Sequence, residues 1–137
     1  MILAISLPGY EETIGGKPCR LLLRNGEIER FEVQHAPFGV FALWDQLFGR
    51  GAAPQVRHVR DIVALGLVGG GLTDRAADQF IADLPPSENM ALRQIAQRLL
   101  GVTFLPAVLD GAPRKKRGGS GSASATPGQS DTTPPPV

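Results

Sequence analysis

Two histidines, His35 and His58, and one cysteine, Cys19, are the residues of this 137-residue chain best suited to acid–base or nucleophilic chemistry. A Cys–His pair could be drawn from them, but no helix N-terminus or cationic cluster marks Cys19 as an activated thiol. His35 comes just before Pro37, so we predict a surface or capping role for it. His58 lies within residues 56–60, which we interpret as the solvated flank of an amphipathic helix. The sequence therefore predicts no catalytic residue and no enzyme.

The run GLVGGG, from Gly66 to Gly71, has the glycine content of a phosphate-binding loop. Such a loop follows a strand and leads into Lys and then Ser or Thr. Here a helical pattern precedes the glycines, and Leu72 and Thr73 follow them without a lysine. We interpret the glycines as the end of a helix and the turn after it. No His, Cys, Asp or Glu residues have metal-ligand spacing, so we expect no metal, no cofactor and no small-molecule substrate.

Charge is divided unevenly along the chain, although the formal net charge is only +1. Residues 1–110 contain ten Lys and Arg against twelve Asp and Glu, whereas residues 111–137 carry a net charge of +3. A mildly acidic domain lacks the basic face of a nucleic-acid module, so we predict no nucleic-acid binding. The basic run RKKR at 114–117 either touches an acidic partner or nucleic acid, or solubilises the start of a tail. We favour the second interpretation.

An Asn25-Gly26 dipeptide separates two runs, 20–24 and 27–33, that resemble strands. Asn-Gly between extended runs is a strong hairpin signal because both turn positions need positive φ. We therefore predict a β-hairpin over residues 20–33. Residues 8–18 contain two prolines and three glycines, so they are expected to form a loop.

Helical spacing of apolar residues predicts four helices after the hairpin, over about 38–48, 56–68, 74–84 and 88–100. Thr73 and Ser87 are expected to cap the last two. The first helix holds four of the eight aromatic residues, and its wide apolar arc is typical of a central core helix or of one that is partly an interface. The apolar residues at helical spacing are Phe38, Phe41, Leu43, Trp44, Leu47 and Phe48 in the first helix; Val59, Ile62, Val63 and Gly66, which form one stripe, in the second; and Met90, Ala91, Ile95, Leu99 and Leu100 in the fourth. In the third helix, Ala77, Phe80, Ile81 and Leu84 are predicted to face inward.

The predicted fold class is α+β, mostly helical, with an N-terminal β-hairpin, about four helices and a disordered C-terminal tail. Gly, Pro, Ser and Thr fill 17 of the 27 positions in 111–137, too polar a composition to offset the entropy of ordering. We expect an N-terminal arm at 1–18, a globular domain at 19–110 and the tail at 111–137. No signal peptide and no membrane-length apolar run is recognised, so a cytoplasmic protein is expected.

Four stretches, 21–31, 39–49, 59–72 and 91–100, carry a resemblance to a known family. In order and spacing they resemble the gene transfer agent tail family, described as tail tube or tail assembly chaperone proteins of long-tailed phages and prophage-like particles. The resemblance covers roughly residues 19–105, and its most specific part is the helix ending in GGGL at 69–72. The first 16 residues look like an addition to the pattern, and Trp44-Asp45-Gln46 replaces a more acidic run.

The resemblance implies a non-enzymatic role in virion assembly. The leading hypothesis is a tail assembly chaperone that binds the tape measure protein and helps to recruit tail tube subunits. Its partner-binding face would comprise Phe41, Trp44, Phe48 and Phe80. The alternative is a structural tail tube subunit of a phage or gene transfer agent particle, although tube proteins are generally β-rich. The protein could also self-associate. A longer product made by ribosomal frameshifting is left open, with the Lys115-Lys116 codons as a candidate frameshift site.

Overall fold

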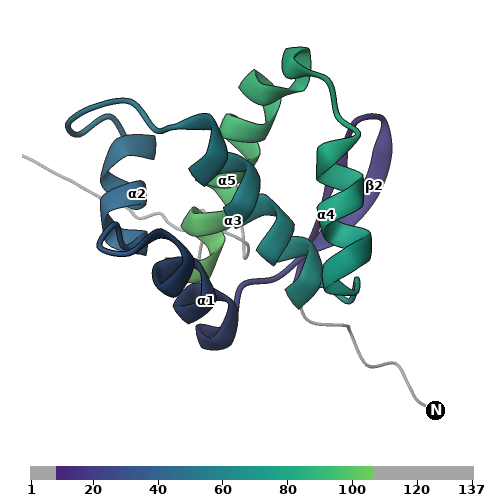
Figure 1. The fold of residues 1–137 in the computed structure, drawn as a ribbon, viewed down its shortest axis with the longest axis horizontal. Helices are drawn as coiled ribbons and strands as arrows, with labels where there is room; N and C mark the ends of the chain where they lie inside the picture. The colour runs from purple at the N-terminus through teal and green to yellow at the C-terminus, as the bar shows by residue number, and fades with distance from the viewer. Residues whose placement is uncertain (1–8, 107–137) are drawn as a thin grey trace, which may run out of the picture. The chain divides into compact units, whose positions relative to one another are not determined.

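The computed structural model describes residues 9–106 (Figure 1). Of these, residues 9–103 belong to one compact unit and residues 104–106 to a second. The predicted class, α+β and mostly helical with an N-terminal hairpin, is confirmed. The elements in chain order are β1 Tyr10–Ile14, β2 Lys17–Leu21, α1 Asn25–His35, α2 Val40–Leu47, α3 Val56–Gly69, α4 Asp74–Ala82, a 3-10 turn Pro86–Glu88, and α5 Asn89–Phe104.

The hairpin is present, but its predicted position at Asn25-Gly26 is wrong. Strands β1 and β2 pair antiparallel around Gly15 and Gly16, whose φ angles of 58° and 84° give the turn its left-handed backbone. The loop predicted over 8–18 is therefore wrong from residue 10 onward. The division into 1–18, 19–110 and 111–137 stays a prediction, and residues 1–8 and 107–137, including the basic run at 114–117, lie outside the described part of the chain.

Residues 25–35 form helix α1 because Arg24 and Glu27 close a capping box. The Oε1 atom of Glu27 accepts hydrogen bonds from the backbone N–H and the Nε of Arg24, at 2.8 and 3.1 Å. This satisfies an otherwise orphaned donor at the helix start. Glu27 is 5% exposed, and its bonds to Arg24 lower the pKa of its carboxyl group. The cap and the burial of Phe31 one turn later outweigh the turn preference of Asn-Gly.

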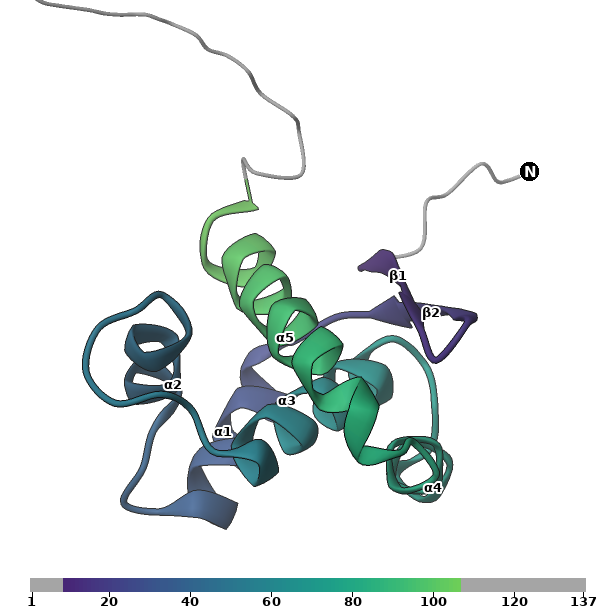
Figure 2. The same ribbon diagram turned by 90° about the horizontal axis from the view of Figure 1, so that it is seen from above.

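Helix α3 is the centre of the fold and is covered on several sides. It contacts α1, α4 and β2, and Figures 1 and 2 both show it between α1 and α4. The predicted stripe of Val59, Ile62, Val63 and Gly66 is buried, as expected. Because neighbours cover more than one face, Ala64, Leu65 and Leu67 are buried as well, so residues 62–67 of α3 are buried on every side.

The glycines at the end of α3 have two roles. Gly70 is the C-cap and Gly71 has a φ of 126°, which confirms that the run ends a helix. Gly66 and Gly69 instead let the chain after β2 approach the helix backbone. The N–H of Leu22 donates to the carbonyl of Gly66 at 3.0 Å, and a Cβ on Gly69 would lie 1.9 Å from the carbonyl oxygen of Leu22.

The hairpin is fixed to α5 by a paired carboxylate. Arg98 donates from Nε and Nη2 to both carboxylate oxygens of Glu12, at 2.8 and 3.0 Å. The hydroxyl of Tyr10 donates to the same carboxylate at 3.0 Å, and burial together with Glu12 raises the pKa of that phenol. Ile14 and Leu21 are buried in the core. The two strands are thus held on the helices rather than projecting from them.

The last two helices follow the predicted pattern, except that Ser87 is not a cap and two apolar residues at the start of α5 are exposed. The Thr73 hydroxyl accepts a bond from the backbone N–H of Ala76 at 3.0 Å, so the predicted cap of α4 is confirmed. Ser87 is not a cap, because it lies inside a 3-10 turn that begins at Pro86. Met90 and Ala91 share the predicted helical spacing but are exposed, because the buried stripe of α5 starts one residue later. That stripe consists of Leu92, Ile95, Ala96, Leu99 and Leu100.

Candidate functional site

Helix α2 and its C-cap carry three of the four predicted binding residues, and α1 fixes where α2 begins. The Glu32 carboxylate accepts a hydrogen bond from the backbone N–H of Val40 at 2.9 Å. A Cβ on Gly39, the N-cap of α2, would lie 2.8 Å from that same carboxylate oxygen. The carboxylate therefore occupies the position where a helix N-terminus favours negative charge.

Three of the predicted partner-binding residues lie together on α2. The helix buries Val40, Leu43 and Leu47 on one side. Phe41 is 69% exposed and Phe48 40% exposed, so of the two interpretations of this helix, a core helix or partly an interface, their exposure favours the second. The half-buried Trp44 packs on Phe48 with ring centroids 4.3 Å apart. We call Phe41, Trp44 and Phe48 the α2 aromatic face.

Phe80, the fourth predicted partner-binding residue, does not join the α2 aromatic face. It lies half-buried on α4, and both ribbon views place α4 and α2 on opposite sides of α3 (Figures 1 and 2). Periodicity predicts which residues of one helix share a face, but it carries no information on which helices are neighbours. That any of the four binds a partner stays a prediction.

The histidines occupy an interior cluster that the sequence analysis did not predict. His58 is 3% exposed, and its ring stacks on Phe38 with centroids 4.2 Å apart and planes 9° apart. Its solvated placement is therefore wrong, because α3 is buried on more sides than a single amphipathic stripe requires. The ring of His35 meets that of His58 at 4.6 Å and 85°, and buried Phe31 packs on both rings.

The ring of His35 does not lie on the surface either. Its side chain is 6% exposed, and Nε2 lies 2.7 Å from Oδ2 of Asp61. Gln34 donates to the same carboxylate oxygen at 3.2 Å. The two imidazoles thus differ, since one is paired with a carboxylate and both ring nitrogens of His58 lack a hydrogen-bond partner.

The Cys–His pair considered from the sequence is not favoured by this arrangement. The Cys19 thiol lies on β2 and contacts the carbonyl of Lys17 at 3.5 Å. Burial raises its pKa, which is opposite to what a nucleophilic thiolate needs. Among residues 9–106, no three His, Cys, Asp or Glu side chains are placed to hold a metal ion.

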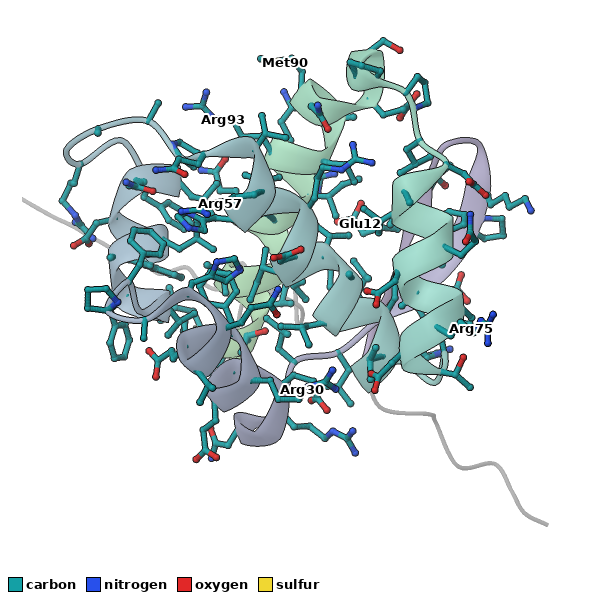
Figure 3. The ribbon with its side chains drawn as sticks, viewed as in Figure 1. Glu12, Arg30, Arg57, Arg75, Met90 and Arg93 are labelled. Atoms are coloured by element: carbon teal, nitrogen blue, oxygen red, sulfur yellow. The ribbon has the colours of Figure 1, made fainter. Side chains whose placement is uncertain are left out.

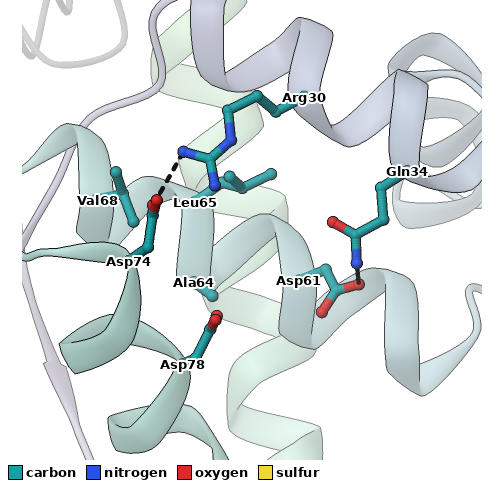
Figure 4. Close-up of a pocket in the computed structure, with 8 residues that line it drawn as sticks. All are labelled: Arg30, Gln34, Asp61, Ala64, Leu65, Val68, Asp74 and Asp78. Atoms are coloured by element: carbon teal, nitrogen blue, oxygen red, sulfur yellow. Dashed lines mark hydrogen bonds and ion pairs between the residues drawn. The ribbon is translucent and has the colours of Figure 1, made fainter.

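A pocket of about 100 Å³ lies between α1, α3 and α4 (Figure 4). Four of its polar side chains pair with one another: Arg30 Nη1 lies 3.0 Å from Oδ1 of Asp74, and Gln34 bonds Asp61. Pockets that enclose small-molecule ligands have volumes of roughly 300–1,000 Å³, so this one is too small for such a role. We interpret it as a gap bridged by interhelical polar contacts.

Comparison with known families identifies the chain. Residues 10–105 match the model of a family described as "Phage tail tube protein, GTA-gp10". The chain belongs to this family. The predicted resemblance to a gene transfer agent and phage tail family is thereby confirmed. The match to the tail tube family begins at residue 10, so residues 10–16, which the sequence analysis treats as an addition, are part of it. No curated protein and no solved structure matches the chain.

Membership of the tail tube family supports a role in assembly with other tail proteins. It favours the alternative of the sequence analysis, a tube subunit, over the chaperone role. None of the helices within 9–106 is both long and apolar enough to cross a membrane.

Met90, at the start of α5, is another exposed side chain outside the α2 aromatic face. It is 67% exposed, and Arg93 follows it one turn later on the same helix (Figure 3).

Proposed function

We propose that the protein is a non-enzymatic tail protein of a phage or gene transfer agent, acting as a tail tube subunit. The family match over residues 10–105 carries this proposal. A tube subunit must bind copies of itself and neighbouring tail proteins. The expected partners are therefore the tape measure protein, other tail proteins and further copies of this chain, with assembly taking place in the cytoplasm.

One edge of the hairpin is suited to contacts between subunits. In the described chain, β1 pairs only with β2. Ile14 and Lys17 flank the two-residue turn and form a hydrogen-bonded pair, so Thr13 and Pro18 form the next pair, which is not hydrogen-bonded. The backbone N–H and C=O groups of a non-hydrogen-bonded pair point away from the partner strand, toward the outer edges of the hairpin. Pro18 has no N–H and blocks the outer edge of β2, whereas Glu11 and Thr13 leave the outer edge of β1 competent to pair.

The tail assembly chaperone is kept as a second candidate because two observations favour it. Rings built on shared sheet need more strand than two five-residue strands supply. The α2 aromatic face also presents an exposed Phe41 together with the contacting rings of Trp44 and Phe48, which suits reversible binding of apolar helices of a tape measure protein.

Co-expression with the tape measure and tail tube genes of the same locus, followed by particle purification, separates the two candidates. A tube subunit remains in finished particles in many copies. A chaperone is lost from particles and co-purifies with the tape measure protein before assembly. Absence from both fractions contradicts both candidates.

Phe41→Asp tests the α2 aromatic face directly. We expect it to reduce recovery of the partner complex at least tenfold, because it places a charge in an apolar contact. Val33→Asp is the matched control, since Val33 is 80% exposed on α1 outside that face. The readout is the amount of complex recovered by affinity purification at equal expression. Equal loss in both variants would argue against a specific role for α2.

A further inference from the structure

The ring of His58 is a buried polar group without a partner. It is 3% exposed, and neither Nδ1 nor Nε2 makes a hydrogen bond. Buried polar groups are nearly always hydrogen-bonded, and this ring is an exception. Packing alone therefore holds the ring in place. Its closest packing partner, Phe38, belongs to the segment that joins α1 to α2.

Few charged groups face this ring, and they do not favour a proton on it. The imidazole of His35, from α1, and the guanidinium of Arg57, from α3, both oppose a positive charge on His58. Asp61, also on α3, favours one, but its carboxylate is already bonded to His35 and Gln34. The joining segment contributes the apolar ring of Phe38 to the stack.

We propose that His58 and Phe38 form an acid-sensitive latch, which releases the α1–α2 connection and α2 from α3 when His58 gains a proton. A protonated ring would be a buried cation with two N–H donors and no acceptor, which is strongly unfavourable. Cation–π attraction to the stacked Phe38 recovers only part of that cost. Movement of the joining segment would take Phe38 off the ring and let water reach it.

The pH range of the latch follows from the direction of the pKa shift. Burial, together with His35 and Arg57, lowers the pKa of His58 below its ordinary value of 6.5. The folded state therefore binds fewer protons at this site than the open state. The latch is closed above pH 6.5 and loses stability as the pH falls below that value.

Trp44 reports on this movement, because it is the only tryptophan in the chain and lies on α2. Its emission is recorded from pH 8 to pH 5 on the full chain, with far-ultraviolet circular dichroism on the same samples. We expect a red shift with a midpoint below 6.5 while most of the helical signal remains. A flat emission curve, or loss of helix together with the shift, would overturn the latch.

Three substitutions test whether His58 is the group that titrates. His58→Leu should abolish the shift down to pH 5, and His58→Phe is a second variant in case the leucine form folds poorly. His35→Gln removes a neighbour that opposes protonation, so the midpoint should move to higher pH. Persistence of the wild-type transition in both His58 variants would overturn the assignment, as would its disappearance in His35→Gln.

Discussion

Gly69→Ala is expected to lower the free energy of unfolding by about 3 kcal/mol, at the upper end of the usual overpacking cost. A methyl group at this position would lie 1.9 Å from the carbonyl oxygen of Leu22 and 2.9 Å from its carbon. The obstacle is backbone rather than a flexible side chain. That backbone is itself held, because the Leu22 N–H bonds the carbonyl of Gly66. Relief therefore requires the chain after β2 to leave α3.

The control for this prediction is Gly26→Ala, in the first turn of α1. No atom lies within 4 Å of a Cβ built there, and its φ is not positive, so alanine should be neutral or slightly stabilising. Urea unfolding curves of both variants give the difference. In thermal unfolding, Gly69→Ala should lower Tm by roughly 10–20 °C for a domain of this size. Similar stability of the two variants would show that the close approach at Gly69 is absent in solution.

The four predicted helices emerged from the sequence because apolar residues recur at helical spacing within each of them. Helix α1 did not, because its cap is an arginine backbone paired with Glu27 and not a Ser, Thr, Asp or Asn. The Asn-Gly dipeptide at its start gave a stronger local signal for a turn. Gly15-Gly16 supplies the same backbone freedom, so two turn candidates competed and tertiary packing decided between them.

The candidate site was only partly predictable for a related reason. Spacing on α2 correctly grouped Phe41, Trp44 and Phe48, but which side of the helix meets the core depends on where α1 places it. The burial of His58 depends on Phe31 and Phe38, which reach it from other segments. Contacts between distant segments leave no local pattern, so a histidine between two arginines resembles a solvated position.

Arg60→Ala is expected to cost about 2 kcal/mol of stability, because it removes several hydrogen bonds from a charged donor at once. Arg60 Nη1 donates to Oδ1 of Asn89 at 2.6 Å, and Nη2 donates to the carbonyls of Ile81 and Leu84, the latter at 3.3 Å. These acceptors end α4 and begin α5. A cation at the C-terminal end of α4 also complements the helix dipole.

Arg57→Ala provides the comparison for Arg60, one helical turn earlier on α3. Arg57 is exposed, and its Nε donates to Oε1 of Gln55, two residues away, at 3.1 Å, so its loss should change stability by less than about 0.5 kcal/mol. Arg60→Lys should fall between the two, because one ammonium cannot reproduce the planar fork that spans Asn89 and the carbonyls of α4. The urea concentration at the midpoint of unfolding ranks the three variants by stability. Hydrogen exchange should show faster opening at the 83–89 connection in Arg60→Ala alone, because that arginine is the side chain joining α3 to both helix ends.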